Sequence, residues 1–116
     1  MAYSDNQSGL VGERVLERPK YRNVTATTDT LTFADTDAFI TCSNAAATTV
    51  TIPATSAVSF VVGTVITIFS NGAGGVTIAK TGTDVLNGTA TAAQNTARRI
   101  IKVSESAGVS TWFAFV

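Results

Sequence analysis

Twenty threonines, all of them from Thr25 onward, restrict the fold of this chain more than any other sequence feature. Threonine, valine and isoleucine branch at Cβ, so they lose side-chain freedom in a helix and fit the pleated surface of a sheet. From residue 25 onward they recur in short runs of period 2, separated by Gly, Asn, Asp and Ser. Such alternation with turn residues between the runs predicts an all-β fold.

Seven strands are expected. They cover residues 30–34, 38–43, 49–53, 65–70, 76–80, 98–105 and 110–116. Short strands separated by frequent turns are typical of an antiparallel β-sandwich or a small jelly-roll-like barrel. The last two strands read as a hairpin that turns at Ser106-Ala107-Gly108. Only residues 89–99 hint at a helix, and their threonines weaken that hint.

A short internal repeat is present. The segments VTIPATS (residues 50–56) and VTIAKTG (residues 76–82) share a VTI core. Stacked repeats generally need at least three copies for stability. We therefore interpret the repeat as the reuse of β-forming residues.

Charge divides the chain into an arm and a body. The segment from Met1 to Arg22 carries seven of the sixteen charges, whereas the segment from Ala38 to Ala79 carries none. We place an extended N-terminal arm at residues 1–24 and the β body at residues 25–116. The arm is either a disordered tail or a segment that orders against a partner, and we favour the second because it carries anchors as well as charge. The candidate partner-binding residues are Tyr3, Arg14, Leu16, Arg18, Tyr21 and Arg22.

The residue inventory argues against catalysis. The chain has no histidine and one cysteine, Cys42, which excludes Ser/His/Asp or Cys/His catalysis and zinc sites that need several such ligands. Cys42 is expected to be buried. Asp35 and Asp37 read as a solvated turn between strands, and no spacing links Asp84 to Glu105. We predict no enzyme activity, no cofactor and no metal site.

Partners of strongly opposite charge are also disfavoured. The formal net charge is zero, so no global field attracts nucleic acid. The most apolar stretch, residues 57–69, is too short and too polar for a membrane helix, which needs about 20 apolar residues. The segment from Met1 to Gly12 lacks the apolar core of a signal peptide. We expect a soluble protein made in the cytoplasm, with neither nucleic acid nor membrane as a partner.

The glycine-rich segment SNGAGGVTIAK, residues 70–80, raises the question of a phosphate-binding loop. Such a loop must open a helix, whose N-terminal N–H groups hold the phosphate. Here the loop is followed by Val76-Thr77-Ile78, a β-branched run that favours a strand. We predict a hairpin turn.

The charge-free stretch predicts an interface, since the cores of protein interfaces are depleted in charge and enriched in aromatic residues. In the last strand Phe113 and Phe115 share one face and Trp112 the other, whereas a small sheet usually buries one face. We therefore expect a homo-oligomer, the alternative being a strand covered on both faces within the monomer. The candidate interface residues are Phe60, Phe69, Trp112, Phe113 and Phe115.

Residues 49–88, TVTIPATSAVSFVVGTVITIFSNGAGGVTIAKTGTDVLNG, and residues 98–116, RRIIKVSESAGVSTWFAFV, resemble a β module of bacteriophage virion proteins. The module occurs in small head-decoration proteins, head fibres and tail fibres, and the resemblance covers about 60 of the 116 residues. It is a likeness of pattern and supplies no catalytic residues.

The resemblance implies an all-β module that often trimerises and attaches to a particle. With the N-terminal arm, it indicates a capsid decoration or cement protein, a trimer that binds the major capsid protein on the outside of a phage head and stabilises the head. The protein would then belong to the virion surface after synthesis in the host cytoplasm. The alternative is a receptor- or carbohydrate-binding head-fibre or tail-fibre module, with its site on loops 70–75 or 81–88.

Overall fold

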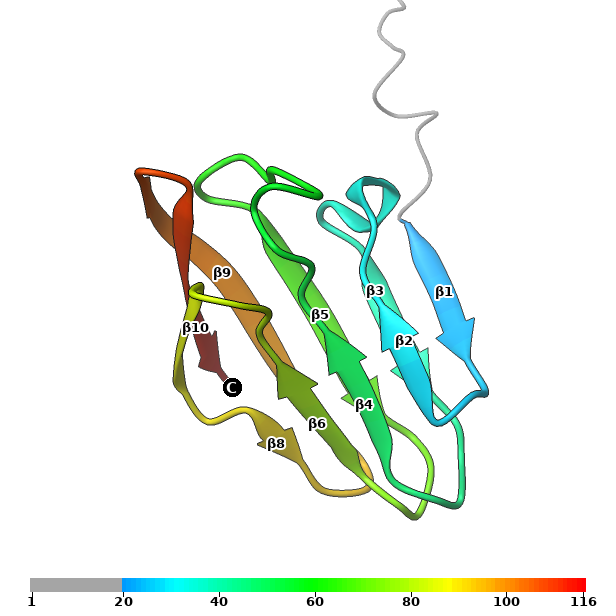
Figure 1. The fold of residues 1–116 in the computed structure, drawn as a ribbon. Helices are drawn as coiled ribbons and strands as arrows, with labels where there is room; N and C mark the ends of the chain where they lie inside the picture. The colour runs from blue at the N-terminus through cyan, green and yellow to red at the C-terminus, as the bar shows by residue number, and fades with distance from the viewer. Residues whose placement is uncertain (1–19) are drawn as a thin grey trace, which may run out of the picture.

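The computed structural model describes residues 20–116, which form two β-sheets packed face to face (Figure 1). Sheet A has six strands in the order β1-β3-β5-β9-β10-β7, and sheet B has four in the order β2-β4-β6-β8. In Figure 1 sheet B lies in front of sheet A. The predicted all-β fold is confirmed, and the two separate sheets make it sandwich-like.

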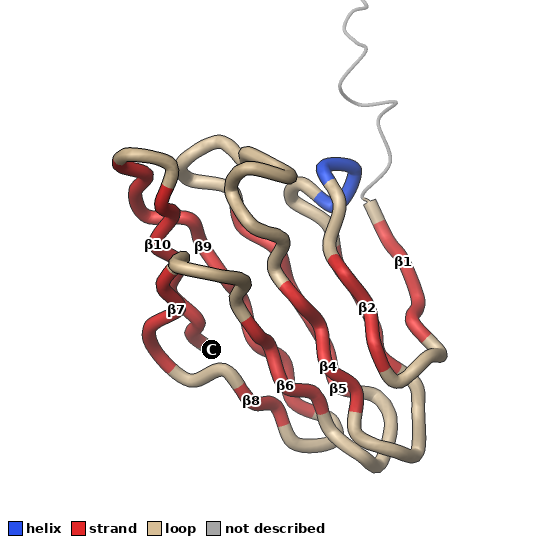
Figure 2. Tube along the Cα trace, viewed as in Figure 1, coloured by secondary structure: helices blue, strands red, loops and turns tan. Residues whose placement is uncertain are grey.

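The strands are short. Those of sheet A are β1 (Tyr21–Val24), β3 (Phe39–Cys42), β5 (Val65–Ser70), β7 (Val85–Gly88), β9 (Thr96–Ser106) and β10 (Val109–Phe115). Those of sheet B are β2 (Thr28–Thr30), β4 (Thr48–Thr51), β6 (Val76–Ala79) and β8 (Thr91–Ala92). A single 3-10 turn, η1 (Phe33–Asp35), is the only helical element of the described residues (Figure 2).

Six of the seven expected strands are present. The expected strand at residues 30–34 is wrong, because β2 ends at Thr30 and η1 follows it. The side chain of Asp35 turns the chain there by accepting a hydrogen bond from the Thr32 N–H at 2.9 Å. The helix hint at residues 89–99 is also wrong, since these residues hold β8 and the start of β9. β1 and β7 were not expected.

The pairing of the strands differs from the prediction. From β1 to β6 the chain alternates between the two sheets, so each strand lies parallel to the strand two places earlier. β7 also pairs with β10 in parallel, and only the β5–β9, β9–β10 and β6–β8 pairs are antiparallel. The antiparallel prediction is therefore wrong for most pairs, because period 2 specifies the face of a side chain and not the direction of its neighbour.

The internal repeat has a structural counterpart. The two VTI segments contribute to β4 and β6, which are parallel neighbours in sheet B. The sequence match sets Val50 against Val76, whereas in the sheet Val50 pairs with Ile78. The match is thus slipped by two positions from the register of the strands. Such a slip keeps every side chain on its face.

The glycine-rich loop connects β5 in sheet A to β6 in sheet B, so the predicted hairpin is wrong. It packs against the preceding loop between β3 and β4. A Cβ on Gly72 would lie 2.0 Å from the Asn44 carbonyl oxygen, and a Cβ on Gly74 would lie 2.0 Å from the Ala46 carbonyl carbon. Glycine is thus required here by backbone contact between successive connections.

The inner faces of the two sheets form one apolar core. Its fully buried side chains come from strands of both sheets and from the β9–β10 hairpin, and they include Ile40, Val50, Ile68, Ile100 and Trp112. Cys42 is buried as expected, and burial raises the pKa of its thiol.

A bulge in β9 places two charged side chains on one face. Trp112 pairs with Lys102 and Thr111 with Ser104, which leaves one extra residue in β9. Residues three apart in a regular strand face opposite sides, but the bulge lets Lys102 donate hydrogen bonds both to Glu105 and to the Phe60 carbonyl at 2.6 Å. The bond from Lys102 lowers the pKa of Glu105. Buried Lys102 thereby holds the 53–64 connection over β9.

The β9–β10 hairpin is confirmed, and its turn yields a test. Ala107 and Gly108 form the two-residue loop, with φ of 53° and 77°. Positive φ at both positions defines a type I′ turn, which prefers Asn-Gly, whereas alanine is strained in this region. We predict that Ala107→Asn raises the free energy of unfolding by about 0.5–1 kcal/mol.

Urea denaturation measures the change. The control is Ala46→Asn, at an exposed alanine without positive φ. Equal stability of the two variants would contradict the strain at Ala107.

Candidate interaction face

The outer face of sheet A carries an unusual set of side chains. In β10 the alternation turns Trp112 and Ala114 into the core and Phe113 and Phe115 outward. The same parity turns Tyr21, Phe39 and Phe69 outward from β1, β3 and β5. We call these five residues, with Arg99, the aromatic face.

The aromatic rings form two groups across the sheet. On one side Phe39 stacks on Tyr21 at 6.4 Å and on Phe69 at 6.5 Å between ring centroids, which joins β1, β3 and β5. On the other side Phe113 stacks on Phe115 at 5.8 Å. Tyr21 exposes 64% of its surface, and Phe39 and Phe113 each expose 42%. Large exposed apolar patches are uncommon on monomeric proteins and mark interaction sites.

The aromatic face is close to electrically neutral. Among the outward-facing strand residues of sheet A, only Arg99 is charged. Its guanidinium lies 5.0 Å from the centroid of the Phe115 ring and donates to the Val116 carbonyl at 2.9 Å. Such a surface offers stacking and apolar contact rather than an electrostatic field.

A polar network borders the first aromatic group. The Asn23 side-chain oxygen accepts from the hydroxyls of Thr41 at 2.7 Å and Ser43 at 2.8 Å. The Tyr21 and Thr41 hydroxyls are also 2.8 Å apart. These bonds fix the outward side chains of β1 and β3 relative to each other, so this part of the face is ordered before any partner binds.

The structure divides the predicted interface residues. Phe69 lies in the first group of the aromatic face, and Phe113 and Phe115 form the second. Phe60 and Trp112 do not, because they meet in the core in a T-shaped contact at 5.5 Å and are buried. Neither can contact a partner in this fold.

Three members of the aromatic face, Arg99 and two aromatic residues, are not among the predicted interface residues. Tyr21 falls in the predicted arm, and Phe39 is predicted only as a residue of a strand. The sequence alternation could have shown that Phe39 points outward. Ile40 and Cys42 are buried, so Phe39 and Thr41 face the other side of the strand.

The candidate arm residues are only partly described. Tyr3, Arg14, Leu16 and Arg18 lie outside the described residues. Tyr21 and Arg22 belong to β1, which pairs with β3, so the body includes residues that the predicted 1–24 arm had claimed.

Arg22 points into the sandwich and joins the two sheets. It binds both carboxylate oxygens of Asp29 at 2.7 and 2.8 Å and both of Asp35 at 3.0 and 3.1 Å. The bonds to Asp29, then those to Asp35, raise the pKa of Arg22 although partial burial opposes them. Asp35 is buried, so the expected solvated turn is wrong for it, whereas Asp37 is exposed.

Asp84 is a second buried carboxylate with a structural role. It accepts hydrogen bonds from the Ser110 N–H at 3.0 Å, from the Thr55 N–H at 3.2 Å and from the Thr55 hydroxyl. It therefore ties the 53–64 connection to β10. Within residues 20–116 no three His, Cys, Asp or Glu side chains gather as metal ligands, and no helix is long and apolar enough to cross a membrane.

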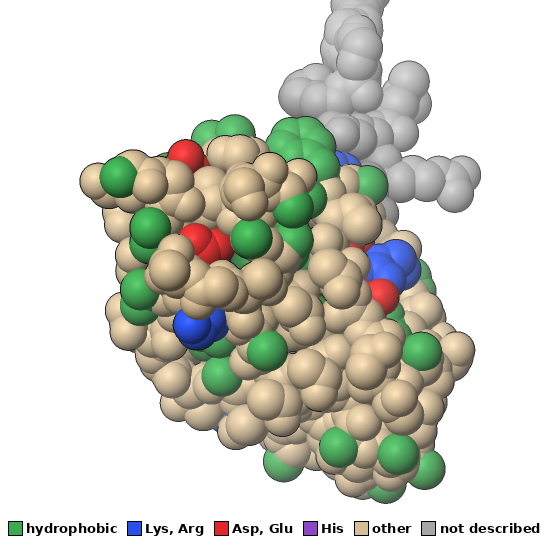
Figure 3. Space-filling view, viewed as in Figure 1, with side chains coloured by type: hydrophobic (Ala, Val, Ile, Leu, Met, Phe, Trp, Pro, Cys, Tyr) green, Lys and Arg blue, Asp and Glu red, His purple; other side chains and the backbone are tan. Residues whose placement is uncertain are grey.

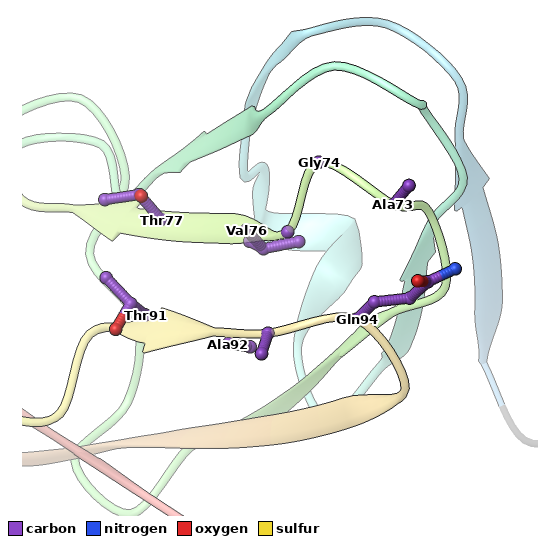
Figure 4. Close-up of a pocket in the computed structure, with 9 residues that line it drawn as sticks. Ala73, Gly74, Val76, Thr77, Thr91, Ala92 and Gln94 are labelled. Atoms are coloured by element: carbon purple, nitrogen blue, oxygen red, sulfur yellow. The ribbon is translucent and has the colours of Figure 1, made fainter.

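A shallow groove of about 420 Å³ lies beside the glycine-rich loop (Figure 4). It is uncharged, and its lining residues are Ala73, Gly74, Gly75, Val76, Thr77, Thr91, Ala92, Ala93 and Gln94. Four N–H groups of the loop donate to backbone carbonyls. Those of Asn71 and Gly72 bond to Cys42, that of Gly74 bonds to Asn44, and that of Gly75 bonds to Gly72.

Comparison with known proteins adds no relative. No family model, no curated protein and no solved structure matches this chain.

The aromatic face yields a test by self-association. We predict that Phe39→Ser and Phe113→Ser together convert an assembled protein to monomers, because they remove exposed ring area from both aromatic groups. Light scattering coupled to size-exclusion chromatography measures the mass. The matched control is Thr30→Ser with Thr91→Ser, at exposed positions of sheet B. A wild-type monomer, or a double variant that assembles like wild type, would contradict a role in self-association.

Proposed function

We propose that this chain is a structural protein of a bacteriophage particle, a capsid decoration or cement protein that acts as a trimer on the outside of the head. The observation that carries the proposal is the ordered, nearly neutral aromatic face of sheet A. Its composition fits the core of a protein interface. The resemblance of residues 49–88 and 98–116 to virion modules supplies the biological setting.

In this proposal the two parts of the chain have different partners. The aromatic face meets other copies of the chain and assembles the trimer. The arm binds the major capsid protein through Tyr3, Arg14, Leu16 and Arg18. Arg22 is occupied by Asp29 and Asp35, so we assign it a structural role instead.

Such a protein works mechanically and needs no chemistry of its own. A trimer presents three arms, so each further arm binds at the high effective concentration set by the first. Weak single contacts then suffice to bridge neighbouring capsid subunits. The compact body, with Arg22, Asp84 and Lys102 fastening its connections, would resist deformation as the head is loaded.

Deletion of residues 2–18 tests the role of the arm. The deletion spares Lys20 and all of β1, so we expect an unchanged circular dichroism spectrum and an unchanged oligomeric mass. Binding to purified heads that lack the protein should be lost, because the capsid contacts are removed. Co-sedimentation measures it, with Tyr3→Ala and Arg14→Ala as partial-loss variants. Normal binding by the truncated trimer would contradict the proposal.

The groove beside the glycine-rich loop favours a second candidate function, a carbohydrate-binding virion module. Its threonine hydroxyls and the Gln94 amide can bond to sugar hydroxyls, and its lack of charge suits a neutral glycan. A glycan array with the wild-type protein should then show binding that Thr77→Ala and Gln94→Ala abolish. An array without signal, or binding that survives both changes, would exclude this site.

A further inference from the structure

Three apolar side chains are exposed at one end of the sandwich, apart from the aromatic face. Phe33 in η1 exposes 59% of its surface, and Val61 and Val62 in the 53–64 connection expose 69% and 52%. We call these three residues the end patch. Within the segments 31–38 and 53–64, which carry these three residues, the only exposed charged residue is Asp37, while Glu105 of β9 accepts a hydrogen bond from Ser59. Hydrophobic side chains gather at this end in Figure 3, next to the start of the grey segment.

The end patch is held in place by its surroundings. The Val61 carbonyl accepts from the Thr64 N–H at 3.0 Å and from the Thr64 hydroxyl at 2.6 Å, and Gly63 adopts a φ of 98°. The Gly63 N–H is bonded to the Lys102 carbonyl at 2.8 Å. Turns of this kind favour polar residues, glycine or proline. Two exposed valines in a hydrogen-bonded turn therefore indicate that another segment covers them.

Phe33 is ordered in the same way. Its ring stacks on Phe60 at 6.1 Å between centroids, and Phe60 is buried in the core. One side of the Phe33 ring thus lies on the body while most of the residue stays exposed. The patch combines an aromatic ring and branched side chains on a fixed base.

The topology places the end patch beside the point where the chain enters the body. β1, β3 and β5 are parallel neighbours, so their first residues lie at the same end of sheet A (Figure 1). Phe33 precedes β3, and Val61 and Val62 precede β5. Lys20 precedes β1, and its carbonyl accepts from the Phe39 N–H at 2.9 Å. Residues 1–19 therefore join the body at this end.

The nearest apolar residues before Lys20, apart from Pro19, are Val15 and Leu16. Four residues of extended chain reach about 13 Å. Thr67 of β5 is level with Tyr21 and two strand spacings away from it, about 10 Å, and the end patch lies beyond the first residue of β5 on the side where the chain enters β1. Leu16 can therefore reach the end patch, and its attachment to the body gives it a high effective concentration there. We infer that the end patch is a docking site for Val15 and Leu16 of the chain's own N-terminal segment.

This inference does not depend on the proposed function. It concerns the isolated protein and holds whatever the aromatic face binds. Leu16, which we also propose as a capsid contact, must leave the end patch before it can bind a head. Coverage by Val15 and Leu16 removes apolar surface from water at the end of the body.

Disulfide trapping in the full chain tests the docking. We pair Leu16→Cys with Val62→Cys, and as a control Leu16→Cys with Ala46→Cys, which lies at the other end of β3. Buried Cys42 does not compete. A disulfide needs the two Cα atoms within about 7 Å. We expect the first pair to form an intrachain disulfide at least about ten times faster than the control under mild oxidation.

Dye binding gives an independent readout. Leu16→Asp should uncover the end patch and raise the fluorescence of an apolar dye roughly twofold or more, and adding Val61→Thr and Val62→Thr should reverse the rise. Ala46→Asp is the charge-matched control. Equal trapping rates for the two cysteine pairs, or unchanged dye binding in Leu16→Asp, would overturn the inference. Disulfides formed between chains instead of within one would also overturn it, by showing that a second copy covers the patch.

Discussion

The crossing of the chain between two sheets at every strand from β1 to β6 is the constraint on which the rest of the structure depends. In this part no strand pairs with the next strand in sequence. Each strand finds its partner only after the chain has passed to the other sheet and come back. We call one strand of each sheet, with its connections, a coil. The hydrogen bonds within each sheet are therefore made between successive coils. Folds with such long-range pairing form slowly and need connections that fit each other closely.

The connections meet this requirement through direct backbone contact and side-chain hydrogen bonds. Asn44 illustrates both, since its amide donates to the Thr25 carbonyl at 2.7 Å and its own backbone lies against Gly72. Three successive loops are thus joined through one residue. At the first coil Arg22 does the equivalent work, because its paired carboxylates come from β2 and from η1. This partly buried charge is tolerated because both sides of the guanidinium fork bind carboxylates.

The local sequence pattern predicts which face of its sheet most side chains occupy. It does not predict which strands pair with each other. The period-2 runs located β3 to β6, β9 and β10, and the split of Trp112 from Phe113 followed from parity alone. β1 was not predicted because its sequence, YRNV, does not alternate apolar and polar residues. Its inward Arg22 is acceptable only beside Asp29 and Asp35, which no local rule brings together. Lys102 was hidden for the same reason, since its pairing with Glu105 depends on a bulge.

The candidate face was partly predictable by the same logic. The absence of charge from residues 38–79 drew attention to Phe69, while Phe113 and Phe115 followed from the last strand. Phe60 was misjudged because the path of a long connection over the core cannot be read from its composition. The apolar run of this connection suggests an exposed interface. In the structure Phe60 is buried in the core, and the two valines after it belong to the end patch.

The second coil, which runs from β3 to β5 and from β4 to β6, has an evolutionary consequence. The first coil is shorter, because Tyr21 and Phe39 are 18 residues apart and Thr28 and Thr49 are 21 apart. A residue of β3 and a residue of β4 find their parallel partners equally far along the chain, as the pairs Phe39–Thr67 and Thr48–Val76 show. Residues that pair across neighbouring parallel strands face the same side of the sheet, so this coil keeps each paired side chain on its own face. One complete coil, with a strand for each sheet and its connections, is therefore a unit that could be copied or removed without turning the core outward. The body can thus gain or lose this coil while the closing hairpin stays the same.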